Sequence, residues 1–350
     1  MNLLDKNTLR VIFTILATVA LLSFLWLARK PLLVFLFAML FAYLLEPLIG
    51  LLQRWTRAGR GVAIAIVYIL LLGGLFTSVA AVGPRVIEEG RRLSQAAPEL
   101  YNKFASGSIA LQVGQARGWS AQTQQSVQQF IVSHRDEVLT TLSEQGAKLT
   151  GMAANTLWIV LIPILAVFFL SDKSRFANGI ERLFSDPHSR RLVHDVMNDL
   201  DGMLSHFVRA QLYLAAISCA VYVTGLSLLH APYALVLGIL GGLLEFIPFV
   251  GPMVAGVLIL GVAFGFNYPH LLAVLLFLLL WRGVQDYIIS PRVLGGRVEV
   301  HPLLAIFGVL AGGEIAGVAG IYFAVPVLAA IRILWQRWHE RGRAASSTAL

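Results

Sequence analysis

The sequence is poor in charged residues: Asp, Glu, Lys and Arg make up only 13% of its 350 residues, whereas a soluble globular protein carries about 25%. Hydrophobic residues make up 57%, and the mean hydropathy is +0.76. This composition excludes a water-soluble enzyme and a disordered chain. Because the apolar residues occur in long blocks, we predict an all-α fold, that of a polytopic helical membrane protein in a lipid bilayer.

Cysteine is almost absent as well. The single cysteine, Cys219, lies inside an apolar block, so one chain can form neither a disulfide nor a cysteine zinc site. The sequence contains no His-Glu-x-x-His motif, no Gly-x-x-x-x-Gly-Lys phosphate loop and no nucleophile elbow in a suitable setting. We therefore expect no enzymatic activity, no cofactor or metal, and no ATP-driven transport by this chain alone.

Acidic residues are outnumbered by basic ones, 19 against 27, which gives a formal net charge of +8. In a soluble chain such an excess would favour nucleic-acid binding. Here the basic residues lie mainly in short loops between apolar blocks, so they indicate membrane topology and not a nucleic-acid partner.

Residues 1–83 are predicted to hold three membrane spans. The first has no small-residue cleavage site, and a second span follows at once, so we interpret it as a retained helix and not as a signal peptide. A basic loop without acidic residues separates the last two spans. The spans are 11–28, 32–52 and 61–82, and the loop carries Arg54, Arg57 and Arg60.

Residues 84–150 differ in character from the spans. They follow Gly83-Pro84, which we expect to end or kink the third span. The segment has mixed charges and a Gln-rich patch, yet it keeps apolar residues at helical spacing. We predict a helical extramembrane arm; a low-complexity linker is the alternative.

Residues 151–206 are predicted to hold a fourth span and then a cytoplasmic amphipathic helix. In the latter, Leu192, Val196 and Leu200 fall on one face, as in a helix that lies at the membrane interface. We expect a C-terminal transport core over 207–338 that begins with a fifth span, followed by a disordered cytoplasmic tail. The fourth span is 152–170, the fifth is 207–229, and the tail is 339–350.

Segment 233–266 is too long for one simple span and too short for two. Its middle reads Glu245-Phe-Ile-Pro248-Phe-Val-Gly251-Pro252, and the two prolines and the glycine interrupt a helix there. Each half has about 12–14 residues, or about 20 Å, against about 30 Å of hydrocarbon. We predict a re-entrant helical hairpin whose tip lies inside protein or a water-filled cavity.

Segment 301–335 repeats this pattern, with an interruption at Gly312-Gly313-Glu314. We predict a second re-entrant hairpin; a single kinked span is the alternative for both segments. With cytoplasmic N- and C-termini, two hairpins also place Arg292 and Arg297 inside, as the positive-inside rule prefers. The fold would have about six full spans and two opposed broken helices, an arrangement with which many secondary transporters build a site.

These two regions carry a resemblance to a known family. The sequence resembles the autoinducer-2 exporter (AI-2E) family of bacterial membrane proteins, and the resemblance covers nearly the whole chain. Many members of the family carry an acidic residue near the position of Asp286, but at a slightly different spacing within the motif. The matching motifs are Gly241-Gly-Leu-Leu-Glu-Phe-Ile-Pro-Phe-Val-Gly-Pro252, Gln285-Asp-Tyr-Ile-Ile-Ser-Pro-Arg-Val-Leu-Gly295, His301-Pro-Leu-Leu304 and Gly312-Gly-Glu314.

The resemblance implies a multi-pass membrane protein that self-associates as a homo-oligomer. Some members look like exporters of the signalling molecule autoinducer-2, and others look like sodium(lithium)/proton antiporters. We therefore expect a secondary transporter of the bacterial inner membrane that exports a small polar solute and is coupled to protons. A Na⁺(Li⁺)/H⁺ antiporter and a membrane scaffold without transport activity are the alternatives.

Glu245 is the first candidate for a site residue, because ionisable groups inside a membrane are functional by default and a carboxylate can cycle a proton. The alternative is a structural acid that accepts hydrogen bonds from free backbone N–H groups. Pro248, Gly251 and Pro252 are expected to shape the tip, where open carbonyls could bind a cation or a polar solute. The same two alternatives apply to Glu314 beside Gly312 and Gly313.

Gln285 and Asp286 are candidates for lining a polar pathway between the two hairpins. The simpler alternative is an ion pair between Arg282 and Asp286 on a helix surface, since the two are four residues apart. Ser290 precedes a proline, and we expect this pair to stop the helix.

Overall fold

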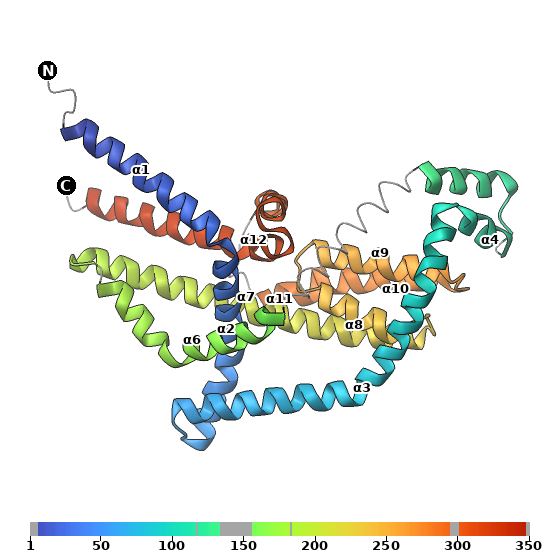
Figure 1. Cartoon of the computed structure of the whole chain (residues 1–350), viewed down its shortest axis with the longest axis horizontal. Coiled ribbons are helices and arrows are strands. Elements are labelled where there is room, and N and C mark those ends of the chain that lie inside the picture. Colours follow the sequence, from blue (N-terminus) through green and yellow to red (C-terminus); the bar gives the residue numbers. More distant parts are fainter. Residues whose placement is uncertain (1–5, 117, 134–155, 183, 295–300, 348–350) are drawn as a thin grey trace.

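The structure is a computed structural model that describes residues 6–116, 118–133, 156–182, 184–294 and 301–347. These residues form helices and no strand, which confirms the prediction of an all-α protein (Figure 1). The labelled elements are α1 (Lys6–Leu27), α2 (Arg29–Thr56), α3 (Arg60–Ala105), α4 (Ser108–Ala116), α6 (Thr156–Arg182), α7 (Pro187–Leu228), α8 (Ala234–Leu244), α9 (Val250–Gly265), α10 (Leu271–Val284), the π-helix η1 (Gln285–Ile289), α11 (Ser290–Leu294) and α12 (Pro302–Ser347).

Among the described residues, five helical stretches are long and apolar enough to cross a membrane. This confirms a helical polytopic membrane protein. The shorter apolar helices include both halves of the first broken segment. Residues 134–150 of the predicted arm and 152–155 of the predicted fourth span lie outside the described residues. The five stretches are Arg29–Thr56, Arg60–Ala105, Ser189–Leu228, Leu271–Val293 and Leu303–His339.

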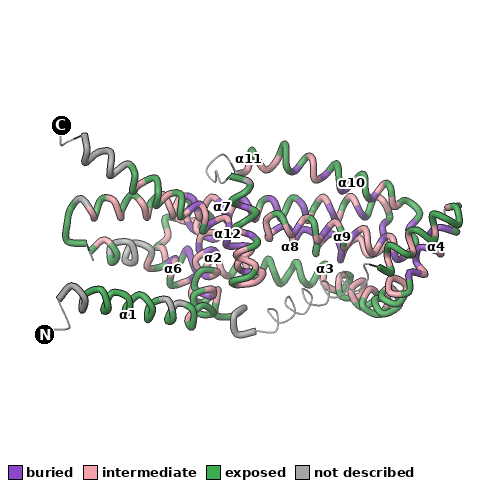
Figure 2. The backbone as a smooth tube through the Cα atoms, turned by 90° about the horizontal axis from the view of Figure 1, so that it is seen from above, coloured by how far each residue is buried: buried purple, intermediate pink, exposed green. Residues whose placement is uncertain are grey.

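Buried residues concentrate where α2, α8 and α12 pack on α7 and where α9 packs on α8 (Figure 2). In contrast, α1 is exposed along its described part, where even Phe13 and Leu27 are open to the surroundings. In both views the first turns of α1 and the last turns of α12 lie at one end of the molecule, and α4 lies at the other end (Figures 1 and 2).

Gly83-Pro84 was expected to end or kink the third span, and of these two outcomes the end is wrong. Helix α3 continues through Pro84 and Pro98 to Ala105, although each proline removes one helical hydrogen bond. The second half of α3 is supported by packing, because Leu100 and Phe104 lie against α9 at Gly265. Contacts with α8 and α9 therefore offset the lost bonds and make the start of the arm an extension of the span.

The first broken segment forms a hairpin. Its two limbs, α8 and α9, run antiparallel with Gly241 beside Ala255, so that a Cβ on the glycine would lie 3.7 Å from the alanine Cβ. Nearer the tip, Gly251 lies against the Leu244 carbonyl. Because glycine has no side chain, contacts of this kind let the backbones of the two short helices approach each other closely.

The second broken segment, within α12, is also a hairpin, but its break lies later than predicted. The chain leaves helical geometry at Ala316 and Gly317, the latter with φ 60° and ψ −139°, a conformation that glycine adopts at little cost. Gly312 stays helical because it serves a different purpose: its backbone packs directly on Gly320 of the second limb. Disorder was also predicted for the tail, 339–350. This is corrected for residues 339–347, which are helical in α12, and residues 348–350 lie outside the described residues.

The second hairpin packs on the first half of α7. Arg337, far along its second limb, forms an ion pair with Asp199, with Nη2 2.6 Å from Oδ2. Nearer the tip, the rings of Tyr322 and Phe207 have centroids 6.0 Å apart. Phe246, from the tip of the first hairpin, joins the same apolar cluster. The tip of the second hairpin therefore points toward the middle of α7.

The first hairpin packs on the second half of α7 in the opposite sense. At its open end the Tyr268 hydroxyl donates to the Leu229 carbonyl, and at its tip the Gln211 side chain donates to the backbone carbonyl of Glu245. Gln211 lies 18 residues before Leu229 and 12 after Asp199, which corresponds to about 27 and 18 Å of helix. The two hairpins thus enter from opposite ends, and their tips approach each other near the middle of α7.

Candidate functional site

The tip of the first hairpin consists of residues that cannot continue a helix. Pro248 lacks a backbone N–H, and Phe249 has φ 64°, so α8 ends and a new helix begins. Gly251 approaches the Leu244 carbonyl so closely that a Cβ would overlap it. Pro252 follows in the first turn of α9, where its missing N–H costs no helical bond. These residues fix the shape of the tip that carries Glu245.

Glu245 lies buried at this tip, with 4% of its surface exposed. One carboxylate oxygen, Oε1, accepts a hydrogen bond from Gln285 Nε2 at 2.6 Å. The same oxygen lies 3.5 Å from Arg282 Nη1. The other oxygen, Oε2, is buried and has no hydrogen-bond partner. An unpaired buried carboxylate oxygen is costly, so it is the feature of this region that most needs an explanation.

Gln285 is the first residue of the π-helix η1, and 2% of its surface is exposed. A π turn takes one residue more than an α turn, and such turns are frequent at functional sites. Its amide connects two elements: Nε2 donates to Glu245, and Oε1 accepts from the Ser218 hydroxyl at 3.4 Å. Ser218 belongs to α7 and is completely buried. The structure thus brings Glu245 and Gln285 together, although they are 40 residues apart.

Asp286 lies at the exposed edge of this group. Arg282 Nε donates to Asp286 Oδ2 at 2.7 Å, and the two side chains are 37% and 43% exposed. The helix-surface ion pair considered from the spacing is therefore present. Because Arg282 also approaches Glu245, its guanidinium connects the exposed carboxylate to the buried one.

Ser290 does not stop the helix, so that prediction is wrong. Helix α11 begins at Ser290 and continues to Leu294, with Pro291 in its first turn. The preceding π-helix has already shifted the hydrogen-bond pattern, and the first turn of a new α-helix accepts proline without loss.

The structure does not bring Glu314 into this group. Glu314 is exposed in the first limb of α12, two residues before the break. In the described part of the chain, no hydrogen bond or ion pair joins it to Glu245, Gln285 or Asp286. Gly312 and Gly313 are partly buried between the limbs, where they allow close packing.

Two members of the group, Gln211 and Ser218, were not found by sequence reasoning. Both are buried in α7, and they lie seven residues apart. Polar residues at i and i+7 on an otherwise apolar helix occupy one face, and this spacing is the signal that could have identified them.

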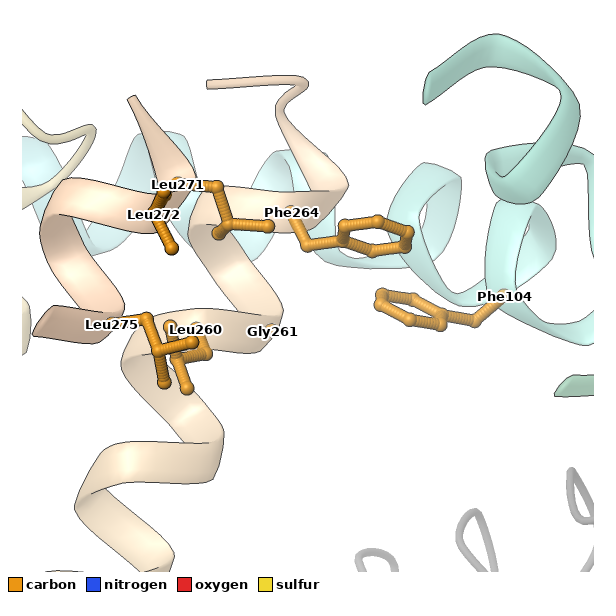
Figure 3. Close-up of a pocket in the computed structure, with 7 residues that line it drawn as sticks. All are labelled: Phe104, Leu260, Gly261, Phe264, Leu271, Leu272 and Leu275. Carbon is orange, nitrogen blue, oxygen red and sulfur yellow. The ribbon is translucent and has the colours of Figure 1, made fainter. Parts of the chain in front are cut away.

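A concave region lies at the open end of the first hairpin, away from its tip. It is a cavity of about 420 Å³ between α3, α9 and α10, with Phe104 and Phe264 on one side and leucines on the other (Figure 3). No charged or hydrogen-bonding side chain lines it, so it is not suited to a polar solute. Its lining residues are Phe104, Leu260, Gly261, Phe264, Leu271, Leu272 and Leu275.

Comparison with known proteins identifies the family. Residues 15–340 match the family described as "AI-2E family transporter". The chain belongs to this family. The match covers all the site residues described above, and it agrees with the resemblance seen in the motifs around Glu245 and Gln285.

Relatives in distant bacteria have the same general description. A candidate transport protein of Bacillus subtilis (strain 168), YueF, is 25% identical over 299 residues, which cover 83% of this chain and 79% of the relative. A second from that organism, YrrI, is 24% identical and covers 88% and 87%. The candidate permease PerM of Escherichia coli (strain K12) is 24% identical and covers 96% and 94%. This AI-2E family protein is therefore a multi-pass membrane transporter.

Proposed function

We propose that this AI-2E family transporter is a secondary transporter of the bacterial inner membrane that exports a small polar solute similar to autoinducer-2. We further propose that export is coupled to protons at Glu245. The observation that carries this proposal is the unpaired oxygen of Glu245, buried at the tip of a helical hairpin inside the protein. Oε2 can accept a hydrogen bond from a solute hydroxyl, and it can also take up a proton.

The net charge of the group formed by Glu245, Arg282 and Asp286 supports the binding of a proton and not of an anion. Glu245 and Asp286 are acidic, and Arg282 is the one basic side chain paired with them in the described structure. The group therefore carries a formal charge of −1 when both acids are ionised. A buried net charge is unfavourable, and a proton on Glu245 neutralises the group.

The opposed hairpins support an alternating-access mechanism. Two short helical hairpins entering from opposite ends leave the tip of the first, with Glu245, near the middle of α7. In transporters built from broken helices, movement of one bundle against another opens such a site to each side in turn. We propose the same here, with both termini in the cytoplasm.

The test is solute efflux from proteoliposomes with and without a pH gradient. We expect Glu245→Gln, which keeps the size of the side chain and removes its exchangeable proton, to abolish the dependence of transport on the gradient. Glu88→Gln, in the exposed arm, is the matched control and should behave as the native protein does. Unchanged, still pH-dependent efflux by Glu245→Gln would exclude the proton role.

A Na⁺(Li⁺)/H⁺ antiporter is the second candidate, because a carboxylate oxygen without a partner in a site of net negative charge can also bind a small monovalent cation. The two functions are separated by a pH-sensitive dye inside the vesicles. A pulse of Na⁺ or Li⁺ should change the internal pH only if the cation exchanges with protons. A solute-dependent signal without a Na⁺ response favours the exporter.

The family resemblance also implies a homo-oligomer, and the exposed apolar surface of α1 is available for a second copy or for lipid. Cross-linking of the protein in native membranes, followed by sizing, measures the number of subunits directly.

A further inference from the structure

The two oxygens of the Glu245 carboxylate have different surroundings. Oε1 faces two donors, Gln285 Nε2 at 2.6 Å and Arg282 Nη1 at 3.5 Å. Oε2 is buried and has no hydrogen-bond partner in the described structure. A carboxylate that is free to rotate would exchange its two oxygens, so a side chain that holds it in one orientation would preserve this difference.

Gln285 is the side chain able to do this. Its donor nitrogen makes the shorter of the two contacts, and its own carbonyl oxygen is held by the hydroxyl of Ser218. Both Gln285 and Ser218 are almost fully buried, at 2% and 0% exposed. Arg282 is 37% exposed and already engaged with Asp286 at 2.7 Å, so water screens its effect on Glu245.

We propose that Gln285 is the positioning residue of the site. Its side chain donates a hydrogen bond to Oε1 of Glu245, so that Oε2 is the one oxygen that exchanges a proton and binds the solute. This inference rests on the proposed function, which assigns the exchange to Glu245, and it adds a buried residue that acts on how tightly the proton is held. Protonation adds one H⁺ from water to Oε2, and the hydrogen bond from Gln285 to Oε1 is kept in both states.

The strength of that bond differs between the two states. A donor bonds more strongly to an ionised carboxylate than to the carbonyl oxygen of a neutral carboxyl group, because the charge assists the bond. Gln285 therefore favours the ionised form and eases release of the proton. Loss of the donor should increase the proton affinity of Glu245 about tenfold, or about one pH unit in the midpoint of titration.

Other groups also face Glu245. They are Arg282 and Asp286 on α10 and η1, and Tyr222 on α7. None of them contacts Gln285 through a hydrogen bond in the described structure, so replacing Gln285 leaves their charges in place. The effect of Gln285 can thus be measured separately.

The experiment uses the purified full-length protein in lipid vesicles and the infrared band of a protonated carboxyl group, recorded as a function of pH. Glu245→Gln identifies the band by removing it. We expect Gln285→Met, of similar size and without a donor, to move the midpoint of this band about one unit to higher pH. The pH profile of solute efflux should move by the same amount.

Gln211→Met is the matched control. Gln211 is also a buried glutamine that donates to Glu245, but it donates to the backbone carbonyl and not to the carboxylate. We expect this variant to lower stability or the overall rate while leaving the midpoint of the band unchanged. An equal shift in both variants would overturn the proposal, because it would show a general effect of removing buried amides.

If Gln285→Met does not fold, Gln285→Leu serves instead. It also lacks a donor for Oε1 of Glu245, so the same alkaline shift is expected. An unchanged midpoint in a folded variant contradicts the role of Gln285 even if Glu245 transports protons. An unchanged pH profile in Glu245→Gln contradicts the proposed function instead, so the two failures are distinguishable.

Discussion

Gly312 and Gly320 lie backbone against backbone across the two limbs of α12, and a Cβ on either residue would overlap the carbonyl of the other. We predict that Gly320→Ala lowers the free energy of unfolding by about 1–3 kcal/mol, because the limbs must separate to admit the methyl group. The measurement is unfolding of the purified protein in detergent, followed by tryptophan fluorescence.

Gly313→Ala is the control for this prediction. A Cβ on Gly313 would meet only the Ile321 side chain, at 3.4 Å, which is an ordinary contact. Its stability should equal or exceed that of the native protein, since alanine favours a helix by about 1 kcal/mol over glycine. Equal destabilisation by both variants would mean that the limbs are not packed as described.

Glu89, in the predicted arm, forms a hydrogen bond to the open end of the first hairpin. Its Oε2 accepts a hydrogen bond at 3.2 Å from the backbone N–H of Val236, the third residue of α8, and Tyr233 at the N-cap provides no side-chain bond. An acid at a helix N-terminus bonds a free N–H and interacts favourably with the helix dipole.

We therefore predict that Glu89→Ala increases hydrogen exchange of the amide at Val236 and destabilises this end of α8 by about 1 kcal/mol. Glu88→Ala is the neighbouring control, because Glu88 pairs with exposed Arg91 and Arg92 on its own helix. Exchange at Val236 that is the same in both variants would rule out capping by the arm.

Arg60 connects three helices near the start of α3. Its Nη2 lies 2.9 Å from Glu46 Oε2 on α2, and its Nε donates to the Leu170 carbonyl on α6 at 2.6 Å. We predict that Arg60→Ala is more destabilising than Glu46→Ala, since only the former also removes a hydrogen bond to a backbone carbonyl of α6. The ion pair itself is half-exposed and should contribute about 0.5–1 kcal/mol, measured as the coupling energy of a double-mutant cycle.

His194, in the polar first part of α7, depends on Glu181 at the end of α6. The hydrogen bond between Nδ1 and Oε1 is 2.7 Å long. This bond and the negative charge of Glu181, with a smaller contribution from Asp195, raise the pKa of His194 above its usual value. The pair is therefore fully formed at pH values below the ordinary histidine pKa and is lost as the pH rises through the raised value.

We predict that the His194 ring titrates at a lower pH in Glu181→Gln than in the native protein, measured by NMR of labelled histidine. Asp195→Asn should cause a smaller shift in the same direction. A larger effect of Asp195 than of Glu181 would contradict the contact between α6 and α7.

The opposed hairpins predict which positions lie on the same side of the membrane. In a Cys219→Ala background, a cysteine at exposed Ser185 should react with an impermeant reagent from the cytoplasmic side, and one at Ser126 in the arm from the opposite side. If both broken segments are hairpins, a cysteine at exposed Arg292 should react from the same side as Ser185. Labelling of Arg292 from the Ser126 side would exclude the pair of hairpins in this topology.

Much of the fold follows from local properties of the sequence. The interruption around Pro248 and Gly251 was predicted correctly, because a residue without an N–H and a residue without a Cβ act on the backbone where they stand. At Pro84 an end or a kink of the third span was expected. The end was wrong, because packing of Leu100 and Phe104 on α9 offset a local helix breaker. The break in α12 was misplaced because glycine serves two purposes, a turn at Gly317 and a close contact at Gly312.

By itself, the sequence determined that this protein is helical, that it lies in a membrane and that a carboxylate stands at a helix break, because apolar runs, prolines and isolated charges act within a few residues of chain. Only the tertiary structure decided which groups surround that carboxylate. Gln211 and Gln285 reach Glu245 from 34 and 40 residues away, and Ser218 holds the amide of Gln285. These contacts exist because α7 and α10 pack on the hairpin in one register. For the same reason the structure separated Glu314 from the group, although its sequence surroundings resemble those of Glu245.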